Sequence, residues 1–97
     1  MFARVSQHAK RLSEILSGSQ DQTIRFDDLC RTLVRLGFVE ARSRGSHRIF
    51  YHESVPDIVN LQPRRDGTAK PYQVRQVREL ILRYRLTERA DAEASDE

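Results

Sequence analysis

This sequence has a single cysteine and no long apolar run, and each scarcity excludes a class of protein. No stretch approaches the ~20 apolar residues that a membrane-spanning helix needs. Residues 1–10 carry polar and basic side chains where a secretory signal has an apolar core, so we expect a cytoplasmic protein. The lone Cys30 excludes an internal disulfide. Because Cys30 falls in an apolar helical stripe, we interpret it as a small buried hydrophobic residue rather than a nucleophile.

The sequence also lacks the ligand spacings of common metal sites. No combination of cysteine, histidine and carboxylate residues has a separation typical of zinc or magnesium binding, so we expect no cofactor and a metal-independent chemistry. His47 and His52 are five residues apart, an odd number that places them on opposite faces of a regular strand. This separation argues against a shared metal ion and against an acid–base pair. His8 is expected at the surface.

The charge is unevenly distributed along the chain. The net charge is +3, but residues 88–97 hold five acidic side chains against one arginine. Residues 1–87 therefore hold 16 Lys and Arg against 9 Asp and Glu, a charge of +7. A positive net charge of this size on so short a segment points to a polyanionic partner such as nucleic acid. A solvated basic surface would have the same composition.

Apolar periodicity and turn residues divide residues 1–87 into six elements of one domain. Helices are predicted at residues 3–17, 25–36 and 71–85, and Pro71 is a favoured first-turn residue. Strands are predicted at residues 38–44, 46–52 and 57–62, with turns at 44–45 and 53–56 and a loop at 63–70. This order predicts an α+β domain whose helices lie on one face of a three-stranded antiparallel sheet. The acidic residues 88–97 are expected to be disordered.

Two features of these elements allow more than one interpretation. In the middle strand, Ile49 and Tyr51 lie on one side and Phe50 on the other, so alternation does not identify the buried face. The apolar stripe of residues 3–17 could complete the core of this domain or contact a partner. We favour the core, because an exposed apolar stripe promotes aggregation.

Three short motifs carry a family resemblance: Leu36-Gly37-Phe38, Gly45-Ser46-His47-Arg48-Ile49-Phe50 and Lys70-Pro71. In this order they resemble the HicA toxins of bacterial toxin–antitoxin pairs over about residues 25–86. The resemblance implies a fold similar to double-stranded-RNA-binding domains (α-β-β-β-α), ribosome-independent cleavage of mRNA and neutralisation by a HicB antitoxin. By position, His47 matches the family's catalytic histidine, and Gly45 and Ser46 match its flanking pair. The helix at 3–17 and the acidic residues 88–97 are extensions beyond the shorter family members.

The residues around His47 also suit RNA cleavage when they are considered without the family. Attack by a 2′-hydroxyl needs a base, charge stabilisation at phosphorus and a proton for the leaving oxygen. Histidine titrates near neutral pH and can serve either proton step. Gly45 allows a tight turn and a close approach of the substrate. The neighbouring guanidinium groups can offer paired donors to phosphate oxygens, and they belong to Arg42, Arg44 and Arg48.

A second basic cluster lies at the start of the last predicted helix. Lys70 directly precedes this helix, where free backbone donors favour anions, and Arg64 and Arg65 lie in the preceding loop. In double-stranded-RNA-binding domains a basic cluster at this place contacts phosphates across a groove. Ordinary solvated side chains are the alternative. Tyr51 and Tyr72 could stack on bases, although packing at the core edge or surface is favoured.

Three functions are consistent with these patterns. The leading hypothesis is a metal-independent endoribonuclease that acts on mRNA with a histidine acid–base catalyst. The second is a non-catalytic RNA-binding module of the same fold, since the positive charge would serve both. The third is a protein-binding role in which the basic face receives an acidic partner.

Overall fold

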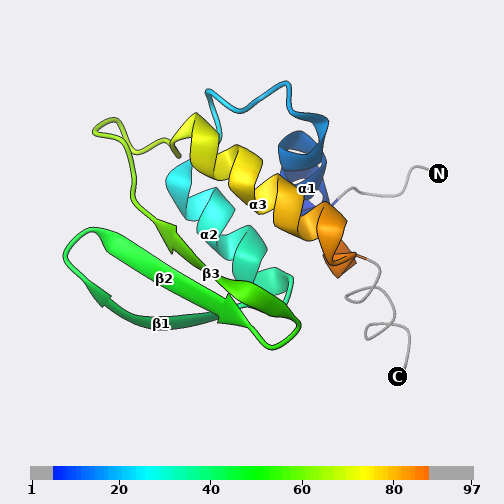
Figure 1. Cartoon of the computed structure of the whole chain (residues 1–97). Helices are drawn as coiled ribbons and strands as arrows, with labels where there is room; N and C mark the ends of the chain where they lie inside the picture. Colours follow the sequence, from blue (N-terminus) through cyan, green and yellow to red (C-terminus); the bar gives the residue numbers. More distant parts are fainter. Residues whose placement is uncertain (1–5, 88–97) are drawn as a thin grey trace.

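The computed structural model describes residues 6–87, apart from the side chains of Ser43 and Arg44. The elements in chain order are α1 (Gln7–Ser17), α2 (Phe26–Arg35), β1 (Val39–Arg44), β2 (His47–His52), β3 (Val55–Leu61) and α3 (Pro71–Arg83). The strands form one antiparallel sheet in the order β1-β2-β3 (Figure 1). The predicted α+β class and element order are therefore confirmed.

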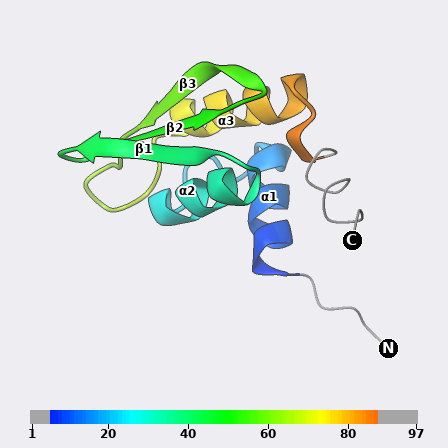
Figure 2. The same ribbon diagram turned by 90° about the horizontal axis from the view of Figure 1, so that it is seen from below.

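The helices lie on one face of the sheet, and residues 6–87 leave the opposite face uncovered (Figure 2). α2 packs against β1 and α3 against β3, while α1 packs on α2 and α3. One core fills the space between the helices and the sheet, and its fully buried members include Ile15, Leu29, Leu33, Phe50, Val59, Leu61, Val74 and Val77. Because Ile15 belongs to this core, the stripe of α1 contributes to it as favoured from the sequence. No helix within residues 6–87 is long and apolar enough to cross a membrane.

The end of α2 follows from its sequence. Gly37 has a φ of 100°, which side chains with a Cβ rarely adopt. Its N–H donates to Val34 O at 3.0 Å, and the Phe38 N–H donates to Leu33 O at 3.0 Å. This pair of hydrogen bonds is a common way for helices to end, because it satisfies the last carbonyl groups of the helix. It also turns Phe38 back into the core.

Three predicted boundaries were wrong by two residues or more, and one of them is the end of α3, at Arg83 instead of residue 85. α1 begins one turn later than residue 3, because Ser6 has an extended backbone and its hydroxyl accepts from the Ala9 N–H at 3.0 Å as a helix cap. β3 begins at Val55 rather than at residue 57, and its pairing with β2 leaves only Glu53 and Ser54 in the turn. Pro56 lies within β3, which is possible because β3 is an edge strand and edge positions need no N–H donor. The acidic residues 88–97 and residues 1–5 lie outside the described part of the chain.

The structure identifies the buried face of β2. Phe50 is fully buried toward the helices, so Ile49 and Tyr51 face the uncovered side of the sheet. On that side Tyr51 pairs with Val39, and both side chains are about half exposed. Ile58 of β3 is more exposed still. The uncovered face therefore exposes apolar side chains toward the β2–β3 turn, at the end of the strands away from His47.

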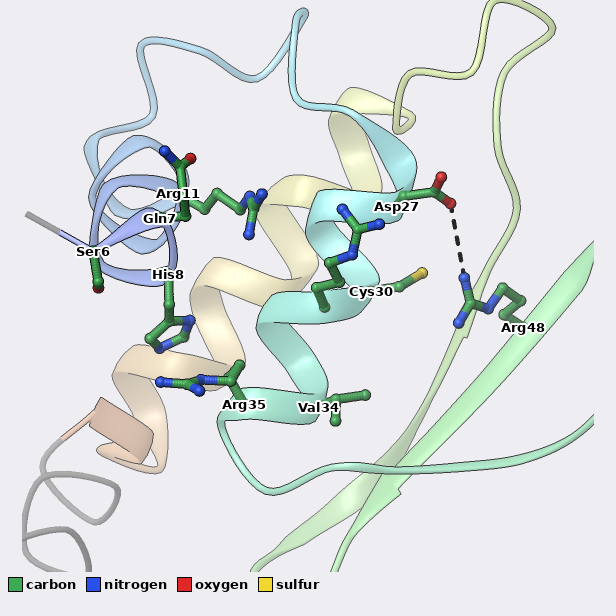
Figure 3. A pocket seen from close by; sticks show the side chains of 10 residues that line it. Ser6, Gln7, His8, Arg11, Asp27, Cys30, Val34, Arg35 and Arg48 are labelled. Carbon is green, nitrogen blue, oxygen red and sulfur yellow. Dashed lines mark ion pairs between the residues drawn. The ribbon is translucent and has the colours of Figure 1, made fainter.

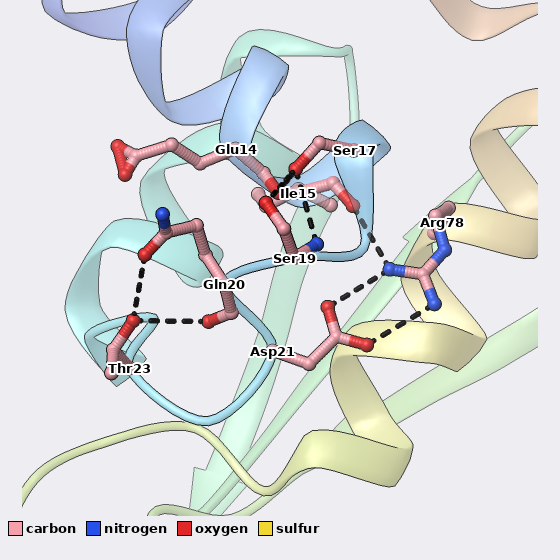
Figure 4. Close-up of polar contacts among 8 residues, drawn as sticks. All are labelled: Glu14, Ile15, Ser17, Ser19, Gln20, Asp21, Thr23 and Arg78. Atoms are coloured by element: carbon pink, nitrogen blue, oxygen red, sulfur yellow. Dashed lines mark hydrogen bonds and ion pairs between the residues drawn. The ribbon is translucent and has the colours of Figure 1, made fainter.

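The side chain of Arg78 connects α3 with α1 and with the linker that follows α1. Arg78 of α3 donates from two nitrogens to the Asp21 carboxylate, at 2.9 and 3.2 Å, and from Nη1 also to the Ile15 carbonyl oxygen at 3.1 Å (Figure 4). Both charged side chains are largely shielded, with 18% and 13% of their surface exposed. Arg78 thereby ties α1 and the following linker to α3.

We expect Arg78→Met to lower the free energy of unfolding by about 2 kcal/mol, because Asp21 and the Ile15 carbonyl both lose a charged donor in a poorly hydrated position. For a domain of this size that corresponds to a melting temperature lower by roughly 4–8 °C per kcal/mol, measurable by circular dichroism. The matched control is Arg75→Met, an exposed position on the same helix. Equal losses in the two variants would contradict this role of Arg78.

Candidate active site

The turn between β1 and β2 presents His47 to solvent. Arg44 pairs with His47, so the turn consists of Gly45 and Ser46 alone. Gly45 has a φ of 61°, the left-handed conformation that two-residue hairpin turns require at this position. A Cβ at Gly45 would meet nothing within 4 Å, so the glycine is needed for its backbone angle rather than for space. His47 opens β2 with an exposed side chain on the uncovered sheet face.

Asn60 of β3 orients the His47 ring. The Asn60 Oδ1 lies 3.1 Å from His47 Nδ1, and both side chains are exposed. An amide oxygen can only accept, so in this arrangement Nδ1 carries the proton and donates it. In the neutral form of this tautomer Nε2 carries the lone pair and can act as a base.

A second polar chain connects the β1–β2 turn to the start of α3. The Gln62 side chain donates to Ser46 Oγ at 3.3 Å and accepts from Lys70 Nζ at 3.4 Å. Gln62 directly follows β3, two residues after Asn60. Ser46, His47 and Lys70, which are separate in the sequence, are thereby brought to one end of the sheet.

Gln73 holds this end of β3 to α3. Its side chain is 5% exposed, its Oε1 accepts from the Gln62 N–H at 3.2 Å and its Nε2 donates to the Asn60 carbonyl at 3.4 Å. The amide therefore occupies the place that a neighbouring strand would take along the free edge of β3. The backbone positions of Asn60 and Gln62 are fixed by these bonds.

Arg48 is not brought to His47, because successive residues of a strand face opposite sides. Its guanidinium lies on the helix side, where Nε and Nη2 donate to the two oxygens of Glu40 at 2.8 and 2.7 Å. Nη1 lies 3.9 Å from Asp27. The hydrogen bonds to Glu40 raise the pKa of Arg48 above its ordinary value. Of the other two arginines near the turn, Arg42 is exposed and the Arg44 side chain lies outside the described part.

The loop before α3 carries two arginines, and its backbone is held by internal hydrogen bonds. Arg64 and Arg65 are exposed. The Arg64 N–H donates to Thr68 O at 2.9 Å, and the Gly67 N–H donates to Arg64 O at 3.0 Å. The Asp66 carboxylate accepts from the Thr68 N–H at 2.9 Å, and its hydrogen bonds to Thr68 lower the pKa of Asp66. The loop is thus a closed turn that carries positive charge next to Lys70.

Among the remaining candidate residues, Tyr72 touches this arrangement, because its hydroxyl accepts from Gln73 Nε2 at 3.3 Å. His52 packs edge-on against Phe38 with ring centroids 5.0 Å apart, and its Nδ1 accepts from the Ser54 N–H, so it has a structural role. Tyr51 and Tyr72 are both about half exposed. Cys30 is buried, and burial raises the pKa of its thiol to about 11, as expected for a hydrophobic residue. Within residues 6–87, no three His, Cys, Asp or Glu side chains lie where they could hold a metal ion.

Three residues of this site were missed by the sequence analysis: Asn60, Gln62 and Gln73. Asn60 and Gln62 were treated as parts of a strand, and Gln73 as a helix position without chemistry. A signal existed in the alternation of β3, where Asn60 is polar between buried Val59 and Leu61. What the alternation could not indicate is that β3 lies beside β2 in the register that brings Asn60 to His47.

Comparison with known proteins agrees with the fold and the motifs. A family described as HicA toxin of bacterial toxin-antitoxin matches residues 26–83, which includes β1, β2, β3, α2 and α3. No curated protein and no solved structure gave a match. Because the matched segment spans more than half of the chain, this chain belongs to the HicA toxin family, whose members are toxins that pair with an antitoxin.

Proposed function

We propose that this toxin is a metal-independent endoribonuclease that cleaves mRNA, with His47 as its catalytic residue. The single observation that carries the proposal is the exposed His47 ring, which Asn60 orients through Nδ1 at 3.1 Å next to a basic loop. Since mRNA is the proposed substrate, the proposed place of action is the cytoplasm.

The chemistry follows from the free Nε2 of His47. Nε2 takes the proton of the substrate's 2′-hydroxyl, and the 2′-oxygen then forms a bond to phosphorus while the bond from phosphorus to the 5′-oxygen breaks. The imidazolium formed in the first step can return its proton to the leaving 5′-oxygen. The products are a 2′,3′-cyclic phosphate and a 5′-hydroxyl end. The proton and electron pairs are all accounted for by the RNA and His47, so the proposed reaction needs neither a redox partner nor a metal.

The substrate is proposed to lie across the end of the sheet. Lys70, Arg64 and Arg65 would bind phosphates on the α3 side, and Arg42 and Arg44 would bind phosphates on the β1 side. The turn residues Gly45 and Ser46 would allow the backbone of the RNA to approach His47. We leave Arg48 out of the proposed substrate contacts, because Glu40 binds its guanidinium on the other face.

The partner is proposed to be a HicB-type antitoxin that covers His47. The motivation is the surface around the site, since the uncovered sheet face exposes apolar side chains and basic side chains lie at its His47 end. A partner with an apolar patch and acidic surroundings is complementary to both. Covering this face would exclude RNA from the histidine.

His47→Ala is expected to lower the rate of RNA cleavage by roughly 10²–10⁴-fold, because the proton acceptor is lost. The same variant should no longer inhibit growth when expressed in cells. Circular dichroism checks that the fold is retained, as expected for an exposed position. Cleavage at the unchanged rate with unchanged products would exclude His47 as catalyst, and RNA binding without cleavage by the native chain would favour the non-catalytic RNA-binding module.

Asn60→Ala is expected to reduce cleavage by about 10–100-fold, a typical effect of losing the group that orients a functional histidine. Asn60→Asp keeps an acceptor and adds a negative charge that favours the protonated ring. In this variant the neutral base forms only at higher pH, so the acidic limb of the pH–rate profile should move upward. Asp57→Ala, an exposed substitution on the same strand, is the control. Identical pH profiles in native and Asn60→Asp protein would contradict the positioning role.

Replacing Arg64, Arg65 and Lys70 together with Ala is expected to weaken RNA binding more than folding. If three phosphate contacts are lost, the slope of log affinity against log salt concentration should flatten by roughly 2 for single-stranded RNA. Fluorescence anisotropy with a labelled oligonucleotide at several salt concentrations measures the slope. An unchanged slope would show that these side chains do not contact the RNA.

A further inference from the structure

A groove crosses the exposed side of α2, on the helix side of the domain and away from His47. It has a volume of about 750 Å³ and lies between the first turns of α1, the outward face of α2 and Arg48 of β2 (Figure 3). Volumes of this size are typical of ligand sites. α1 lies outside the segment that matches the HicA family, so one wall of the groove comes from a part of the chain that this match does not include.

The centre of the groove is apolar. Cys30 and Val34 are four residues apart on α2 and therefore lie on one face of the helix. Cys30 is buried beneath the surface, while Val34 is 51% exposed and offers a contact for an apolar side chain.

The rim next to α1 carries an excess of positive charge. Arg11 of α1 and Arg31 of α2 share one carboxylate, that of Asp28, at 3.0 and 3.3 Å. None of the ion pairs found within residues 6–87 involves the Arg35 side chain, and Figure 3 shows this side chain beside that of His8. Partial burial and the charges of Arg35 and Arg11 lower the pKa of His8, which reflects the positive potential at this end.

The opposite rim is acidic. Arg48 there is neutralised by Glu40, and the nearby Asp27 carboxylate is 71% exposed. A ligand that spans the groove therefore meets positive charge at the α1 end, an apolar centre and negative charge at the β2 end.

We propose that this groove binds an acidic peptide segment of a protein partner, with its carboxylates at Arg11 and Arg35 and an apolar side chain over Val34. Arginine and apolar side chains together are enriched in protein–protein interfaces. A nucleic acid fits less well, because a regularly charged phosphate chain would meet Asp27 and would leave the apolar centre uncovered.

The test uses the full chain carrying His47→Ala, so that its outcome does not depend on the proposed nuclease activity. The probe is the end-blocked peptide Glu-Glu-Leu-Glu-Glu, titrated while the backbone amide signals of the protein are followed by NMR. We expect saturable shifts at Cys30, Val34 and Arg35. Arg35→Glu should weaken binding about tenfold or more, equivalent to roughly 1.4 kcal/mol.

Three controls separate the groove from general attraction to a basic protein. Arg75→Glu makes the same charge change at an exposed position of α3, and it should alter the affinity by less than about twofold. The peptide Glu-Glu-Gly-Glu-Glu lacks the apolar contact and should bind several-fold more weakly. The reason is that it cannot gain the free energy of transferring a leucine side chain from water to a partly buried position. Oligouridine should leave the groove signals unshifted.

The proposal is overturned by any of three results. The first is the absence of saturable shifts at the groove, and the second is an equal loss of affinity in Arg35→Glu and Arg75→Glu. The third is a larger shift of the groove signals by oligouridine than by the peptide, which would identify a nucleic-acid surface instead. Because Arg35 is exposed, its substitution is not expected to affect the fold.

Discussion

The burial of Phe50 is the constraint on which the arrangement of this molecule depends. Phe50 lies in the central strand and is completely enclosed between the sheet and the helices. Removing a buried phenylalanine side chain typically costs about 3–5 kcal/mol, so a register that exposed it would be strongly disfavoured. Since side chains alternate along a strand, its burial also determines the face of every neighbour on β2. His47 is thereby directed to the uncovered face and Arg48 to the helices.

The site at the end of the sheet is assembled by contacts between elements. β3 places Asn60 beside His47, the residue after β3 connects the β1–β2 turn to Lys70, and Gln73 of α3 fixes the backbone of both. The Gln73 amide bonds to the free edge of β3, where an unpaired strand would otherwise be open to pairing with another chain. One buried side chain therefore serves both the stability of the edge and the position of the polar groups.

The helix α1, which lies outside the segment that matches the HicA family, forms a second surface on the other side of the domain. It contributes Ile15 to the core and is tied to α3 through Arg78. Its first turns extend beyond the core and leave a hollow against α2, which has arginines along one rim. The two surfaces differ in chemistry. The end of the sheet has a histidine with an oriented ring and an open basic loop, whereas the groove has an apolar centre between rims of opposite charge.

Much of the fold was predictable from local pattern. The apolar periods of α2 and α3, the glycine after α2, the turn at Gly45 and the proline at the start of α3 each act within a few residues. For the same reason the order of the elements, the α+β class and the place of His47 at the start of β2 could be predicted. The resemblance of the motif Gly45-Ser46-His47 to the HicA family depended on sequence alone as well.

Other features depend on which elements lie side by side, and this is decided by the packing of the whole chain. The sequences of β2 and β3 do not by themselves show that Asn60 contacts His47, because this contact depends on the register between the two strands. Arg48 illustrates the converse, because it follows His47 directly in the sequence and yet is separated from it by the thickness of the sheet. The early start of β3 was missed because a proline normally indicates a turn, and only the position of β3 at the sheet edge makes Pro56 acceptable there. The sequence by itself determined the elements and the chemical groups that they carry, whereas the tertiary structure decided which groups meet, because contacts between distant residues depend on the burial of the whole core.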